Sequence, residues 1–316
     1  MSMFSAPKTR RDMLARMAML AGSTLLPAAW LSAFATAATR RYAPKLSVQI
    51  YVWIQQFQSQ KRTIAEGLDE ALTAIHHAGY RRVELMPEFF QPDLRAKTLG
   101  LLKNEQLEIP TLYAGSTLHE AVEGEKSITA ITQTARELKG AGLHWIVTNP
   151  SPKPRGERKT DAELDLQARN LNRLGTALQK LGVHLMVHHH TPELVDNARE
   201  WRFQLQHTDP QLVSCCVDVD WAVRGGQEPL AFLREVGKRL ASLHLRNDQQ
   251  GVWMEEFGAG DIVYSKITDY LKEIGFSGYL VVELAYEKST KITRSLEEDL
   301  RLSRLYAEKV FGLKSA

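Results

Sequence analysis

The sequence is poor in cysteine and nearly balanced in charge. Its 316 residues include only two cysteines, Cys215 and Cys216, which stand next to each other. A disulfide framework and a multi-cysteine zinc site are therefore excluded. The chain has 40 Lys and Arg against 37 Asp and Glu, which gives a formal net charge of +3. This small excess does not provide the broad basic surface that nucleic-acid binding requires.

The sequence also lacks a long uninterrupted apolar run near its start. The weakly apolar stretch 17–34 contains Gly22 and Pro27, and it falls short of the roughly 20 apolar residues of a spanning helix. A basic segment, 8–16, precedes this stretch, and the small residues 35–38 follow it. This order of basic, apolar and small residues is typical of a secretory signal, although an uncleaved membrane anchor is the alternative.

The basic segment resembles the twin-arginine export motif, since Arg10 and Arg11 are followed by Met13 and Leu14. We predict an export signal over residues 1–37, a short linker over 38–45 and a mature domain over 46–316. The protein is then expected to pass through the export machinery to the periplasm or another exported location, with no stable membrane span after cleavage. The basic residues of the predicted signal carry the whole formal charge excess, so the mature chain is formally neutral and we expect no nucleic-acid partner.

Short apolar runs alternate with longer amphipathic stretches throughout the predicted mature domain. The predicted strands are Leu46–Trp53, Arg81–Met86, Glu108–Tyr113, Leu143–Thr148, Val183–His189, Leu212–Val219, Leu240–Arg246 and Tyr279–Leu284. Predicted helices include Thr63–Ala78, Asp161–Leu181 and Tyr264–Ile274. Eight such units predict an α/β fold, a single-domain (β/α)8 TIM barrel. An open doubly wound sheet is the alternative, but no glycine-rich nucleotide-binding loop follows the first predicted strand.

Residues of metal-binding types end four consecutive predicted strands. They are His188, Asp218, His244 and Glu283. In a barrel the carboxyl ends of the strands meet at one mouth, so these side chains are expected to converge. Imidazole and carboxylate ligands suit one divalent ion, and Mn²⁺, Zn²⁺, Co²⁺ and Fe²⁺ all remain open.

Strand alternation separates the histidines of the triplet 188–190. His188 and His190 are predicted to share one face, while His189 points to the other. His190 can therefore stand beside a metal bound by His188.

The order and spacing of several short strings resemble a known family. These strings are Val48–Tyr51, Gly79–Leu85, Gly182–His190, Val217–Trp221, Leu243–Arg246, Phe257–Asp261 and Val281–Glu283. They are similar to the sugar phosphate isomerase/epimerase superfamily of xylose isomerase-like TIM barrels, and in particular to its inosose dehydratase-like branch.

The resemblance implies a role for each candidate residue. His188, Asp218, His244 and Glu283 would hold the metal, and His190 and Glu84 would be the catalytic residues. We further expect Arg246, Trp221 and Asp261 to contact substrate, the last from a loop that closes over the site. Each has a plainer alternative: a salt bridge of Glu84 with Arg81 or Arg82, a solvated Arg246, a lid or core Trp221 and an ordinary tight turn at Asp261.

The sequence departs from the family pattern at two positions. His188 stands where many of the epimerases have Glu, which removes the symmetric pair of metal-bound glutamates that relay protons. Asn247 stands where related sequences usually carry Asp, and Asp248 is the nearest substitute.

The predicted function is a divalent-metal-dependent isomerase or epimerase that removes a proton beside the carbonyl of a small sugar or keto-sugar. The alternatives are a lyase or dehydratase acting by β-elimination, and a non-catalytic sugar-binding barrel. A DNA-repair endonuclease of the same superfamily would need a basic groove that the neutral mature chain lacks. The substrate, the metal and the oligomeric state are left open.

Overall fold

The computed structural model describes residues 41–314, and the predicted export signal over 1–37 lies outside this part of the chain. Within it, eight parallel strands form one sheet in the order β2-β1-β10-β7-β6-β5-β4-β3. Their bounds are β1 Lys45–Gln49, β2 Val83–Glu84, β3 Thr111–Ser116, β4 Trp145–Pro150, β5 His184–Val187, β6 Val213–Asp218, β7 Leu240–Leu245 and β10 Tyr279–Val282.

The two outer strands of this sheet meet. Isolated parallel bridges join Arg82 to Glu108 and Leu85 to Leu112, next to β2 and β3. The sheet is therefore a nearly closed barrel, and the predicted single-domain TIM barrel is confirmed. A short antiparallel hairpin, β8 Asp248–Gln249 and β9 Val252–Trp253, follows β7.

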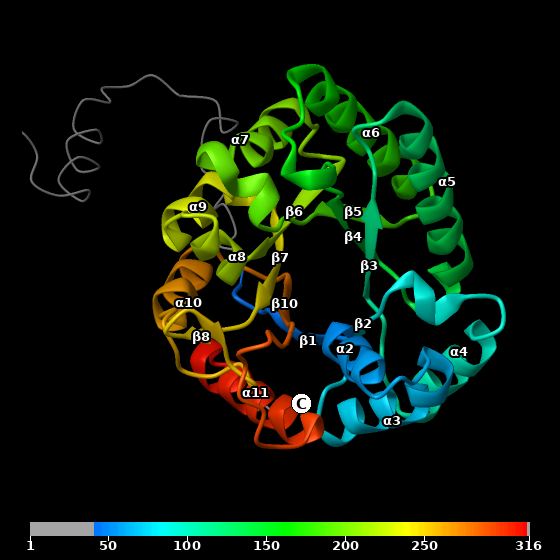
Figure 1. Cartoon of the computed structure of the whole chain (residues 1–316), viewed down its shortest axis with the longest axis vertical. Coiled ribbons are helices and arrows are strands. Elements are labelled where there is room, and N and C mark those ends of the chain that lie inside the picture. The colour runs from blue at the N-terminus through cyan, green and yellow to red at the C-terminus, as the bar shows by residue number, and fades with distance from the viewer. Residues whose placement is uncertain (1–40, 315–316) are drawn as a thin grey trace, which may run out of the picture. The chain divides into compact units, whose positions relative to one another are not determined.

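Helices surround the strands on the outside (Figure 1). They are α2 Tyr51–Ser59, α3 Ile64–His77, α4 Arg95–Asn104, α5 Ala121–Leu138, α6 Asp161–Gln179, α7 Thr191–His207, α8 Val219–Arg224, α9 Pro229–Val236, α10 Tyr264–Glu273 and α11 Leu296–Phe311, with 3-10 turns η3 Pro87–Phe90, η4 Lys139–Ala141, η5 Pro154–Gly156 and η6 Gly237–Arg239. Among residues 41–314, no helix combines the length and apolarity needed to cross a membrane.

The boundaries of α3 follow from the residues at its two ends. The side chain of Thr63 accepts a hydrogen bond from the backbone of Glu66, and the Glu66 carboxylate accepts one from the Thr63 backbone, so α3 begins with a capping box. After this helix Gly79 has φ of 90°, a conformation that glycine adopts without steric cost, and the chain turns there toward β2.

The first predicted strand was too long. β1 ends at Gln49, and residues 51–53, predicted as strand, lie in α2. The Gln49 side chain accepts a hydrogen bond from the backbone of Tyr51, and Val52, Trp53 and Phe57 are buried. Burial of this helical face overrides the β preference of the Ile-Tyr-Val-Trp string.

The barrel interior contains its own small layer of side chains. Tyr113, Val147, Met186 and Cys216 form a buried cluster that is separate from the main core. They come from strands β3, β4, β5 and β6. Because successive side chains on a strand point to opposite faces, the residues two positions further along also point inward. For Met186 and Cys216 those residues are His188 and Asp218.

Candidate metal centre and active site

Four predicted metal ligands converge at one end of the barrel. One ligand atom each from His188, Asp218, His244 and Glu283 lies within 4.8 Å of the others, and all four residues are buried. We call these four residues the tetrad. His188 directly follows β5, Asp218 ends β6, His244 belongs to β7 and Glu283 directly follows β10. These strands are neighbours in the order β10-β7-β6-β5, which explains why their carboxyl ends meet.

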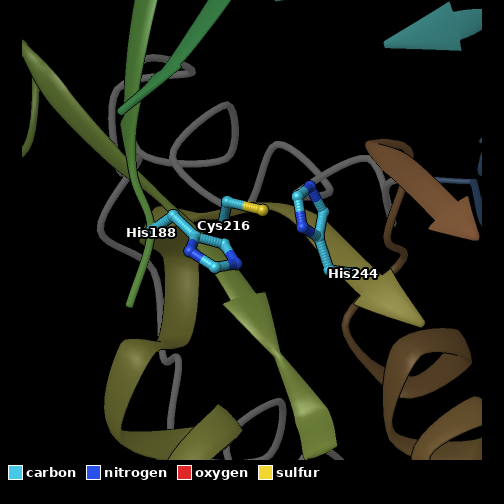
Figure 2. Close-up of side chains that lie close together, drawn as sticks. All are labelled: His188, Cys216 and His244. Carbon is cyan, nitrogen blue, oxygen red and sulfur yellow. The ribbon is translucent and has the colours of Figure 1, made fainter. Parts of the chain in front are cut away.

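Cys216 is a further potential ligand that the sequence did not single out. Its Sγ lies within 4.8 Å of ring nitrogens of His188 and His244. Figure 2 shows the thiol directed toward His244, with the ring of His188 beside it. Burial raises the pKa of this thiol above its usual value. The signal that could have found Cys216 is its position two residues before Asp218, on the same face of β6.

Arg246 connects the two carboxylates of the tetrad. Its Nη2 lies 2.8 Å from Asp218 Oδ2 and 2.6 Å from Glu283 Oε2. The predicted alternative of a solvated Arg246 is wrong, because this side chain is buried. The guanidinium supplies positive charge where two buried carboxylates would otherwise repel each other.

The two carboxylates nevertheless differ in acidity. Burial raises the pKa of Asp218 to about 6, and Arg246 opposes this only in part. Burial also raises the pKa of Glu283, but Arg246 and His244 outweigh it and lower this pKa to about 2. The difference arises because Glu283 has a second positive neighbour in His244, whereas Asp218 lies near further carboxylates.

His244 lies between two carboxylates. Its Nδ1 is 2.6 Å from Glu283 Oε2, and its Nε2 is 3.0 Å from Glu84 Oε1. Burial lowers the pKa of this imidazole, but Cys216, Glu283 and Glu84 raise it well above its usual value. The ring thus has a negative partner at each nitrogen.

His188 differs from His244, because its pKa is lowered and not raised. Within residues 41–314 neither of its ring nitrogens has a hydrogen-bond partner, although the residue is fully buried. Burial and the neighbouring histidines His244 and His190 lower its pKa far below the usual value, so the ring is neutral. A neutral, buried and unpartnered imidazole is costly unless it has a ligand. Its nitrogens, together with the oxygens of Asp218 and Glu283, fit a divalent ion such as Zn²⁺ or Mn²⁺.

His190 lies beside the tetrad. The centre of its ring is 4.9 Å from the centre of the His188 ring, edge to face, and 5.3 Å from the centre of the Trp221 ring. Burial lowers its pKa to about 4, so it is neutral near pH 7. Its Nδ1 is 3.1 Å from Nδ2 of Asn149, a partner on β4 that the sequence did not indicate. The ring of His189 packs instead against Trp201 and Phe232, which confirms the predicted alternation within the triplet.

Of the remaining predicted residues, Glu84 is buried in the barrel, Trp221 lies beside His190 and Asp261 is exposed. Glu84 is fully buried inside the barrel, and the predicted alternative partner Arg82 pairs with Glu108 instead, at 2.9 Å. Trp221 lies against His190, whereas Asp261 is exposed and accepts a hydrogen bond from the backbone of Gly251. The structure thus brings Arg246, Trp221 and His190 to the tetrad, whereas Asp261 is exposed and bonded to the hairpin turn.

The hairpin brings a second tryptophan close to the site. The Arg246 guanidinium is 4.8 Å from the ring centre of Trp253, and the guanidinium of Arg224 is 4.7 Å from the same ring. Trp253 Nε1 donates a hydrogen bond to Asp220 Oδ2, at 2.7 Å. These contacts hold the hairpin over Arg246. Trp253 is therefore part of the wall around the candidate site.

The Asn247 side chain donates two hydrogen bonds and accepts two, and an aspartate carboxylate could only accept. Its Nδ2 donates to the backbone carbonyls of Gly258 and Ile262, at 2.9 and 3.1 Å. Its Oδ1 accepts from the backbone N–H groups of Asp248 and Ile262. Asp248 does not replace the charge at the site, because it faces Arg224 at 3.7 Å.

Comparison with known proteins agrees with this architecture. A family model described as xylose isomerase-like TIM barrel matches residues 72–306. Among curated proteins, an inosose dehydratase of Geobacillus kaustophilus (strain HTA426) is 25% identical over 247 residues, which cover 68% of this chain and 79% of that protein.

Solved structures show the same fold. A sugar phosphate isomerase/epimerase from Parabacteroides distasonis ATCC 8503 superposes with a TM-score of 0.68 and 20% identity, covering 88% of this chain and 97% of the other. The D-psicose 3-epimerase of Clostridium cellulolyticum H10 has a TM-score of 0.67 and 14% identity, covering 84% of this chain and 99% of the other.

Proposed function

The chain belongs to the xylose isomerase-like TIM barrel family, and we propose that it is a divalent-metal-dependent enzyme that removes a proton beside the carbonyl of a small sugar or keto-sugar. The observation that carries the proposal is the buried tetrad with the neutral ring of His190 beside it. We take isomerisation or epimerisation as the first outcome of this step.

The tetrad would hold the metal in this proposal. His188 supports the assignment most directly, because its buried ring nitrogens have no other partner within residues 41–314. A bound divalent ion would act as a Lewis acid on a carbonyl or hydroxyl oxygen.

His190 would move the proton. A base must be unprotonated at working pH, and the lowered pKa of His190 meets this requirement. The Asn149 side-chain amide can present either its nitrogen or its oxygen to Nδ1, since the two are exchanged by a rotation of the amide. With the oxygen facing Nδ1–H, Nε2 is free to accept a proton. With the nitrogen facing Nδ1, Nε2 carries the proton and can donate it.

Three residues would bind the substrate. Arg246 offers guanidinium N–H groups, and Trp221 offers an aromatic face for the C–H surface of a sugar. Asp261 remains a predicted contact, and its carboxylate accepts a hydrogen bond from the backbone of Gly251 in the hairpin turn. Glu84 is a predicted base, but its full burial and its 3.0 Å contact with Nε2 of His244 favour a role through that histidine.

Dehydration is the second candidate. The curated relative in Geobacillus kaustophilus is named an inosose dehydratase. In this chain an imidazole, His188, occupies a tetrad position, so the tetrad has two carboxylates, Asp218 on β6 and Glu283 just after β10, and Arg246 pairs with both. One proton carrier, His190, can serve the loss of a hydroxyl after proton removal as well as isomerisation.

We also propose that the protein works outside the cytoplasm. The support is the sequence of residues 1–37, with its paired arginines, apolar stretch and small residues. In such a location a free sugar or keto-sugar is a more available substrate than a phosphorylated one.

The test combines metal analysis with exchange spectroscopy. Purified protein is expected to contain about one divalent ion per chain by elemental analysis, and His188→Ala is expected to lose it. In D2O, NMR of a panel of free and keto-sugars is expected to reveal deuterium at a carbon beside a carbonyl, or loss of water if dehydration is the outcome.

Two variants make the test specific. His190→Ala is expected to abolish exchange while retaining the metal, whereas His207→Ala, an exposed histidine at the end of α7, is expected to retain both. A wild-type protein that binds no divalent ion and catalyses no exchange would be a non-catalytic barrel, and the proposal would be wrong.

A further inference from the structure

Glu84 is a carboxylate placed where an apolar side chain would be expected. It ends β2, it is 0% exposed, and within residues 41–314 neither of its oxygens has a hydrogen-bond partner. Transfer of a carboxylate from water into such a place costs several kcal/mol unless a positive partner offsets it. The chain therefore retains a costly charge in the barrel interior.

The arginines nearest in sequence do not offset this charge. Arg81 is exposed, and Arg82 pairs with Glu108. The ion-pair partner that the structure provides is His244, whose Nε2 lies 3.0 Å from Glu84 Oε1. This partner belongs to β7, which is separated from β2 by β1 and β10 in the sheet, so the contact crosses the barrel interior.

His244 is a residue whose orientation matters. A histidine ring can be turned over, which exchanges the atoms that its two edges present. In the observed orientation Nδ1 faces Glu283, at 2.6 Å, and Nε2 faces Glu84. A second carboxylate at Nε2 favours a proton on that nitrogen and leaves Nδ1 for the tetrad.

We propose that Glu84 is a positioning residue, which holds the Nε2 edge of His244 toward β2 and thereby presents Nδ1 to the tetrad. The part of this inference that concerns metal binding rests on the proposed function. A carboxylate behind a metal-bound imidazole fixes the ring and increases its basicity, and loss of such a partner typically lowers metal affinity by about 10- to 100-fold. Glu84 then acts through His244 and does not touch the substrate.

This role differs from that of a catalytic base in what Gln can replace. The amide oxygen of Glu84→Gln can accept a hydrogen bond from Nε2–H of His244, but the amide cannot accept a substrate proton. Isothermal titration with Mn²⁺ and with Zn²⁺ is expected to show an affinity loss of about 10- to 100-fold for Glu84→Ala and a much smaller loss for Glu84→Gln. Exchange activity at saturating metal is expected to survive in Glu84→Gln. Equal loss of activity in both variants with unchanged metal affinity would assign Glu84 as a base and overturn the proposal.

A matched control and a metal-free measurement complete the test. Glu200→Gln also neutralises a largely buried carboxylate, one on α7 that pairs with Lys159, and it is expected to leave metal affinity unchanged. In metal-free protein, NMR of the imidazole N–H protons is expected to show a slowly exchanging Nε2 proton of His244 in wild type and not in Glu84→Ala.

The metal-free result separates this inference from the proposed function. If wild type binds no ion but the slowly exchanging Nε2 proton of His244 is present in wild type and absent in Glu84→Ala, the positioning of His244 stands and metal dependence fails. If the Nε2 proton behaves alike in wild type and Glu84→Ala, Glu84 does not position the ring. Circular dichroism of both variants identifies any that fails to fold, and Glu84→Gln then carries the comparison.

Discussion

Arg246 and Asp218 form an ion pair inside the barrel, with Nη2 and Nε of the arginine 2.8 and 3.2 Å from the same carboxylate oxygen. The other oxygen of Asp218 accepts a hydrogen bond from the backbone of Trp221, at 2.9 Å, and so caps α8. One carboxylate thus joins the guanidinium to the start of a helix.

Removal of the guanidinium is expected to destabilise the metal-free protein strongly. Arg246→Met leaves Asp218 and Glu283 buried without their shared cation, and such a loss costs about 3–5 kcal/mol. The measurement is urea unfolding followed by circular dichroism. Arg202→Met is the matched control, because Arg202 pairs with Glu235 at the surface and its loss is expected to cost less than about 1 kcal/mol. Equal effects of the two substitutions would contradict a structural role for the buried pair.

Two neighbouring histidines are expected to respond oppositely to the same substitution. His189→Phe removes two buried ring nitrogens that have no hydrogen bond within residues 41–314 and keeps a ring against Trp201 and Phe232. We expect its stability to stay within about 1.5 kcal/mol of wild type and its metal content to be unchanged. His188→Phe is expected to lose the metal. Elemental analysis and thermal unfolding of both proteins check this, and retention of metal by His188→Phe would show that His188 is not a metal ligand.

The contribution of Glu193 to the stability of the protein is expected to fall between about pH 4.5 and 7. Burial and the nearby Glu200 raise the pKa of Glu193 to about 7, although Lys159 and the backbone N–H of His190 oppose this. In this pH range the unfolded chain releases the proton while the folded protein keeps it, so stability decreases as pH rises. The contribution is complete below the unfolded pKa and is lost as the pH passes through 7.

The corresponding variant removes this pH dependence. Glu193→Gln keeps an oxygen for the His190 N–H but cannot ionise. The difference in unfolding free energy between wild type and variant is expected to change by about 2–3 kcal/mol between pH 4.5 and 7.5. Urea unfolding at both pH values measures this difference, and a constant difference would show that Glu193 ionises as freely in the folded protein as in the unfolded chain.

The substitution Asn247→Asp is expected to loosen the loop that the Asn247 side chain holds. Asn247→Asp places a carboxylate oxygen against the carbonyls of Gly258 and Ile262, which have lost their donor, at a cost of about 2–3 kcal/mol. Faster limited proteolysis within 256–262 is the readout. Asn104→Asp makes the same change at an exposed position and is expected to leave the digestion unaltered. Unchanged proteolysis of Asn247→Asp would show that the loop does not depend on the amide.

The sequence predicted the tetrad because strand alternation and barrel topology are both regular. A period of two places His188 above Met186 and Asp218 above Cys216 on inward faces. Parallel strands of a barrel end on one side, so residues that follow consecutive strands meet there. Convergence of the four side chains is confirmed, whereas their binding of a metal stays a prediction.

The features that the sequence did not predict depend on packing and on charge pairing. Residues Tyr51–Trp53 read as strand, but burial of Val52 and Trp53 on one face of α2 makes them helical. The contacts of Trp253 with Arg246, and of Asn149 with His190, join segments whose separation in sequence carries no periodic signal.

By itself, the sequence determined the number of strand–helix units, the side of the barrel at which polar residues gather and the faces on which they lie, because these follow from local periodicity. The tertiary structure alone decided which charge meets which. Glu84 pairs with His244 across the barrel and not with Arg82 beside it, and Arg246 spans Asp218 and Glu283. These pairs depend on the closure of the sheet, which brings strands that are distant in sequence to within a few ångströms, in an interior where every charge needs a partner.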